Sequence, residues 1–191
     1  SNMTDNKIIA SRLEALREEM RREHLSAFIF PSSDPHMSEY VPSRWEGRKW
    51  ISGFDGSAGT AVVTLHSAAL WTDSRYFIAA EQQLAGTEFQ LMRERLDDTP
   101  TIPEWIAQET KDGDSTEVGV DGMCMALSEV EDMKAELKLL GGLTMRTNLD
   151  ILERVWTDRP SVPSDKLNIQ PMEYAGEACS DKLDRIRYKL L

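Results

Sequence analysis

The feature that most constrains this chain is an alternation of helix-patterned runs with short β-prone runs. The opening segment places apolar residues in steps of four, three and four, at Ile9, Leu13, Leu16 and Met20. That spacing puts them on one face of a helix. Including this one, helical patterns occur at residues 9–20, 75–84, 102–110, 127–140 and 150–155. Between them lie β-prone runs at residues 27–30, 60–65, 68–72, 88–92, 117–121 and 143–145. Only two residues separate the runs 60–65 and 68–72, which is the length of a hairpin turn. Alternating strands and helices with one hairpin predict an α/β fold with a mixed sheet flanked by helices.

The composition of the sequence changes after Trp156. Residues 157–165 contain two prolines among polar residues, which is typical of a linker. Beyond the linker an amphipathic helical pattern runs from Ser180 to the end of the sequence. We therefore expect one domain over residues 4–157, followed at 158–191 by a linker and the first helix of a truncated middle domain. Residues 1–2, ahead of Met3, are expected to be a cloning remnant.

Charge and composition exclude several classes of partner. The 191 residues carry 22 basic and 33 acidic side chains, a formal net charge of −11, so like charge disfavours nucleic acid and anionic membranes. No apolar run reaches the roughly 18 residues of a membrane-spanning helix, and no signal-peptide pattern opens the chain. The two cysteines, Cys124 and Cys179, are too few for a disulfide framework and are expected to be reduced. The expected location is therefore the cytoplasm.

Motif chemistry alone identifies no catalytic residue, metal ligand or cofactor site in this chain. His24, His36 and His66 have no histidine partner four residues away, and no clustered cysteines accompany them. No nucleophile elbow or Walker-type loop occurs. Three glycines at three-residue spacing, in the segment 53–59, resemble a phosphate-binding loop but lack its lysine. We expect them to form a tight turn with close backbone packing before the next strand.

Several segments, in this order, resemble the N-terminal domain of the three-domain Xaa-Pro aminopeptidases (aminopeptidase P). They are 36–40 (HMSEY), 48–61 (RKWISGFDGSAGTA), 70–77 (LWTDSRYF), 98–100 (DTP), 118–121 (VGVD) and 155–160 (VWTDRP). Residues 174–176 (YAG) with 181–183 (DKL) resemble the opening of that family's middle domain. The resemblance covers nearly the whole chain. Any one segment alone would be weak evidence for the family, but the segments occur in the same order, which makes the resemblance specific.

This resemblance implies a non-catalytic creatinase/prolidase N-terminal domain that shapes substrate access. In the family, a C-terminal "pita-bread" domain binds two divalent metal ions, usually manganese, through Asp, His and Glu ligands. The full-length enzyme is expected to be a homodimer that removes the N-terminal residue from peptides with proline at the second position. None of those ligand motifs occurs here, so this chain alone is expected to be inactive.

One residue of the chain is a substrate-binding candidate by resemblance. The family places the arginine of the 70–77 segment, here Arg75, toward the peptide substrate in the assembled enzyme. A planar guanidinium can hold a carbonyl or carboxylate through two parallel hydrogen bonds. The structural alternative is an ion pair with Asp73 or with a carboxylate on a nearby helix.

The other residues of these segments are expected to be structural. The expected core aromatics are Trp50, Trp71 and Phe77, and the expected buried framework residues are Arg48 and Asp73. Two positions depart from the family pattern: Ser74 stands where glycine is usual, and Gly47 where a basic residue is usual. Because of Ser74, the family pattern does not predict the conformation of the loop beside Arg75.

Related proteins of other function share this architecture. One alternative is a metal-free, non-catalytic relative that binds peptides or histones, which the acidic charge also fits. Creatinase and prolidase share the fold but usually lack a segment like 155–160. Sequence beyond Leu191, with or without metal ligands, would distinguish these proteins.

Overall fold

The structure, a computed structural model, describes residues 3–31, 46–121, 127–147 and 151–160. Several expectations fall outside these residues: those for His36, for the segment 36–40, for both cysteines, and for the linker and helix beyond residue 160. None of the described helices has the length and the apolar composition of a membrane-spanning segment.

The domain is built on a six-stranded mixed sheet of order β4-β3-β2-β1-β5-β6. The strands are β1 (Leu25–Phe30), β2 (Thr60–Thr64), β3 (Ala68–Thr72), β4 (Phe89–Arg93), β5 (Glu117–Val120) and β6 (Thr144–Arg146). Strand β2 is antiparallel to both neighbours, and the remaining pairs are parallel. The predicted hairpin is present as β2–β3, with Val63 opposite Ala68. The predicted mixed sheet is confirmed.

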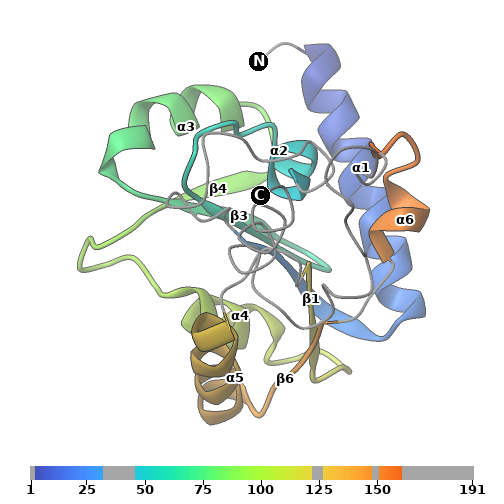
Figure 1. Cartoon of the computed structure of the whole chain (residues 1–191), viewed down its shortest axis with the longest axis vertical. Coiled ribbons are helices and arrows are strands. Elements are labelled where there is room, and N and C mark those ends of the chain that lie inside the picture. Colours follow the sequence, from blue (N-terminus) through green and yellow to red (C-terminus); the bar gives the residue numbers. More distant parts are fainter. Residues whose placement is uncertain (1–2, 32–45, 122–126, 148–150, 161–191) are drawn as a thin grey trace, which may run out of the picture.

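Helices cover both faces of this sheet (Figure 1). One layer contains α1 (Met3–Arg22), α2 (Gly47–Ser52), α3 (Phe77–Leu84) and α6 (Ile151–Val155), and the other contains α4 (Ile102–Thr110) and α5 (Leu127–Gly141). The alternating side chains of β1 show the division: Phe28 and Phe30 join the core under α1, whereas Ala27 and Ile29 join the core under α4 and α5. The apolar stripe predicted for the first helix is buried in the first of these cores.

Helix α2 was not predicted, and it forms the contact that fixes the last described helix. Its Trp50 stacks on Trp156, which directly follows α6, with ring centroids 5.2 Å apart and an interplanar angle of 19°. Both rings are buried, and Ile151 and Leu152 of α6 belong to the same core as α1. Residues 151–156 therefore pack in the same core as α1 and α2.

A network of ion pairs also ties β6 and α6 to α1. Arg154 donates to Glu19 at 2.8 Å and to Glu23 at 2.9 Å. Arg146 donates to Glu23 at 2.8 Å and to Glu117 at 3.0 Å. The hydrogen bond from Arg146 is the main reason that the pKa of Glu23 lies below its ordinary value. The network joins α6, β6 and β5 to the end of α1.

Candidate functional site

The candidate site lies at the end of the sheet where most of the strands finish, called the carboxyl edge below. Because only β2 runs against the others, the carboxyl ends of β1, β3, β4, β5 and β6 share this edge. In open α/β sheets, ligands bind outside the carboxyl ends of the strands. Two segments meet there: residues 53–59, called the glycine loop below, and residues 73–76, called the corner, which follow β3 directly.

The glycine loop requires its glycines. Gly53 ends α2 in a left-handed conformation, with φ of 78°. A Cβ added at Gly56 would lie 2.3 Å from the ring of the buried Phe54, around which the loop wraps. A Cβ at Gly59 would lie 3.0 Å from the carbonyl oxygen of Trp71. The expected tight turn with close backbone packing is therefore present.

Arg48 holds this loop from α2. Its Nη1 donates to the carbonyl oxygen of Gly59 at 3.0 Å, and its Nη2 donates to that of Gly56. From the other side, the hydroxyl of Thr72 donates to the carbonyl oxygen of Ala58 at 2.7 Å. Arg48 is thus the hydrogen-bonded framework residue that we expected, although it is only partly buried.

Arg75 is fixed at the corner by Asp73. The carboxylate of Asp73 accepts the backbone N–H of Arg75 at 3.0 Å and so caps the short helix η2 (Ser74–Tyr76). It also accepts Nε at 3.0 Å and Nη2 at 2.9 Å. These hydrogen bonds lower the pKa of Asp73 and raise that of Arg75. The Arg75 side chain nevertheless remains 61% exposed, so the ion pair given as the structural alternative and an accessible guanidinium are both present.

Tyr76 connects the corner to the glycine loop. Its ring lies 5.0 Å from the guanidinium carbon of Arg75 and packs edge-to-face with Phe54, with ring centroids 6.1 Å apart. Its hydroxyl forms a hydrogen bond with that of Ser57. Asp55, in the same loop, is joined to Gln83 of α3 by hydrogen bonds of 3.0 and 2.8 Å. Sequence reasoning assigned these polar residues no role beyond their membership of the 48–61 and 70–77 segments.

Further charges surround the corner. Glu94 follows β4, and its backbone N–H donates to the carbonyl oxygen of Thr72 at 3.0 Å. Burial, and then the charge of Asp73, raise the pKa of Glu94, while Arg95 acts in the opposite direction. Together, Asp73 and Glu94 balance the charges of Arg75 and Arg95.

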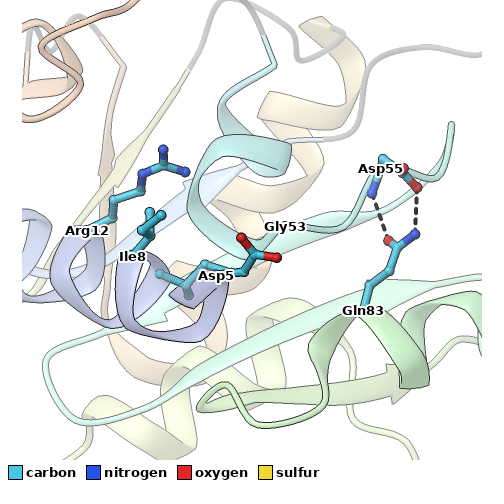
Figure 2. A pocket seen from close by; sticks show the side chains of 7 residues that line it. Asp5, Ile8, Arg12, Gly53, Asp55 and Gln83 are labelled. Atoms are coloured by element: carbon cyan, nitrogen blue, oxygen red, sulfur yellow. Dashed lines mark hydrogen bonds between the residues drawn. The ribbon is translucent and has the colours of Figure 1, made fainter. Parts of the chain in front are cut away.

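A hollow of about 370 Å³ lies between α1, the start of the glycine loop and α3 (Figure 2). It is lined by Asp5, Ile8, Ile9, Arg12, Gly53, Asp55 and Gln83. Figure 2 shows the hydrogen-bonded Asp55 and Gln83 lying apart from Asp5, Ile8 and Arg12 on α1. Arg75 is not among the lining residues, so the hollow is a separate feature from the corner.

The described residues do not fit a metal site. Among them, no group of three or more His, Cys, Asp and Glu side chains could hold a metal ion. His24 follows α1, and His66 lies in the turn between β2 and β3. We therefore assign no metal ligand to the part of the chain that the structure describes.

The departures from the family pattern have local structural consequences. Ser74 is exposed and does not need the conformational freedom of glycine, since His24 and Arg95 are the non-glycine residues with positive φ in the described part. Gly47 is buried, and a Cβ there would lie 3.0 Å from both Asp121 Oδ2 and the ring of Phe30. A longer side chain at position 47 would therefore require its neighbours to move.

Sequence comparison defines the family. Residues 12–147 match the creatinase/prolidase N-terminal domain, and the chain belongs to that family. It is 40% identical over 177 residues to Xaa-Pro aminopeptidase 2 of Rattus norvegicus, covering 92% of this chain and 26% of that protein. It is 38% identical over 180 residues to a probable Xaa-Pro aminopeptidase P of Pyrenophora teres f. teres, covering 94% and 27%. The chain thus spans about a quarter of these relatives, and the predicted family is confirmed.

Solved structures agree with this assignment. The X-prolyl aminopeptidase of Caenorhabditis elegans, described as a cytosolic enzyme with a di-nuclear active site, matches with a TM-score of 0.70 and 30% identity, covering 95% of this chain and 31% of that one. An Xaa-Pro aminopeptidase from Streptococcus thermophilus matches with a TM-score of 0.56 and 17% identity, covering 78% and 98%, which supports the fold alone.

Proposed function

We propose that this chain is the non-catalytic N-terminal domain of a metal-dependent aminopeptidase that removes an N-terminal residue preceding proline. The similar proteins named Xaa-Pro aminopeptidases support this reaction, and the di-nuclear active site of the Caenorhabditis elegans enzyme supports two metal ions, with manganese as our expectation. The substrate is then a peptide with proline at the second position. We further propose a cytoplasmic homodimer for the full-length protein, the compartment being supported by the cytosolic relative.

The role proposed for this domain is to shape substrate access and to contact the peptide through Arg75. The observation that carries this role is an arginine that is 61% exposed yet held by two side-chain hydrogen bonds to Asp73. A guanidinium fixed in this way loses little side-chain entropy when it binds. Its place after β3, at the carboxyl edge of the sheet, suits a ligand-contacting residue on a rigid scaffold.

We expect Arg75→Ala in the full-length enzyme to lower kcat/KM for an Xaa-Pro peptide by about tenfold or more, because a charge-assisted hydrogen bond contributes roughly 1.5–3 kcal/mol. The free energy of unfolding of the present chain should change by less than about 1 kcal/mol, as at other surface positions. Steady-state kinetics and urea unfolding measure the two effects. Unaltered kinetics together with an unfolded chain would make Arg75 a structural residue.

The present chain alone is expected to show no peptidase activity on an Xaa-Pro peptide with added manganese, because its described residues supply no metal-ligand cluster. Chelator-sensitive release of the first residue would contradict this prediction. A full-length protein that is also inactive with metal, but binds basic peptides, would favour the alternative of a metal-free peptide- or histone-binding relative.

A further inference from the structure

We propose that Asp73 sets the ligand preference of Arg75, so that the corner binds a neutral peptide carbonyl oxygen in preference to a carboxylate. This inference rests on the proposed function, because it specifies which group of a peptide meets Arg75. Asp73 acts through Arg75 and is a positioning residue.

The hydrogen bonds of Arg75 define which donors remain for a ligand. A guanidinium carries five N–H donors and no acceptor. Asp73 takes Nε–H and one hydrogen of Nη2. Both hydrogens of Nη1 and the second of Nη2 have no acceptor among the described residues. The outer end of the Arg75 guanidinium, called the fork below, therefore presents donors only. Its ligand must be a hydrogen-bond acceptor.

The charges around the fork decide which acceptor is favoured. Asp73 already neutralises Arg75 through contacts of 2.9 and 3.0 Å. Glu94, partly buried and within electrostatic reach of Asp73, adds a second carboxylate, which Arg95 balances. An incoming carboxylate would bring an additional negative charge to a balanced cluster, whereas a carbonyl would not. The corner is thus built to recognise the uncharged backbone of a peptide.

Tyr76 restricts the fork further. Its ring lies 5.0 Å from the guanidinium carbon, and its hydroxyl is held by Ser57 of the glycine loop. The ring therefore covers part of the guanidinium, and Asp73 covers one edge. The opposite edge is the direction from which a ligand can approach.

The variant Asp73→Asn separates positioning from folding. Asparagine keeps the side-chain oxygen that caps η2, and it is as good a cap as aspartate. It removes the negative charge and replaces the oxygen that accepts Nη2. Asp73→Ser provides a second uncharged cap should the asparagine variant fold poorly.

The test uses the full-length enzyme and paired peptides with proline at the second position. The pairs contain two to five residues and differ only in ending as a carboxylate or as an amide. At the length where the end of the peptide reaches the corner, we expect the unmodified enzyme to favour the amide in kcat/KM by about fivefold, the size of one surface charge interaction. In Asp73→Asn that preference should fall below about twofold, mainly through a lower KM for the acid.

Each other outcome decides the question. If the unmodified enzyme shows no amide preference at any length, or if Asp73→Asn keeps the full preference, the inference is wrong. If the inference about Asp73 fails in this way but Arg75→Ala still lowers kcat/KM, the proposed contact between Arg75 and the substrate stands on its own. If Arg75→Ala has no effect, the proposed contact and this inference both fail.

Discussion

Replacing Trp156 with alanine should lower the free energy of unfolding of this chain by about 3–5 kcal/mol, the usual cost of truncating a buried aromatic residue. Trp156 is 7% exposed and stacks on Trp50 at 5.2 Å. The substitution would leave a cavity between α6, α1 and α2, which the helices could fill only in part. Urea unfolding followed by far-UV circular dichroism measures the effect without depending on tryptophan fluorescence.

Two comparisons give this result its meaning. Leu139→Ala, at a position 85% exposed on α5, should change stability by less than about 0.5 kcal/mol. Ending the chain at Pro160 should also shift the midpoint little, because we place the first domain at residues 4–157. A loss below about 1 kcal/mol for Trp156→Ala would contradict the assignment of residues 151–156 to the first domain.

Arg48→Ala should cost about 2–4 kcal/mol, because it leaves the carbonyl groups of Gly56 and Gly59 without their side-chain donor. It also removes the guanidinium that lies 5.3 Å from the ring of Phe54. Arg48→Lys should recover only part of this loss, since a single ammonium cannot reproduce the planar fork. If Arg48→Ala and the unmodified chain proved equally stable in urea unfolding, the glycine loop would not depend on Arg48 for its stability.

The regular part of this fold could be predicted because its signals are local. A stripe spaced for a helix marked α1, and two β-prone runs with a short turn marked the β2–β3 hairpin. Helix α2 gave no such signal, since six residues are too short for helical periodicity to be read. It is defined by tertiary contacts, above all by Trp50 meeting Trp156, far along the chain.

The contacts of the candidate site likewise divide into those that could be predicted from the sequence and those that could not. The Asp73–Arg75 pair could be anticipated because its members are two residues apart and one caps the turn that carries the other. The pairing of Tyr76 with Ser57 could not, because their hydroxyl groups meet only after β2 and β3 have paired. Phe77, expected in the core, is partly exposed instead: it begins α3, and its ring packs against the guanidinium of Arg93 at 5.7 Å and not within either core.

The most direct test of this account compares the exposed Arg75 with the partly exposed Arg93 in the full-length enzyme. Arg93 resembles Arg75 in being paired with a carboxylate, that of Glu81 at 2.6 Å, and in lying over an aromatic ring. We expect Arg75→Ala to lower kcat/KM for an Xaa-Pro peptide by about tenfold or more, and Arg93→Ala by less than about twofold. Equal values for the two variants would contradict a specific contact between the corner and the substrate.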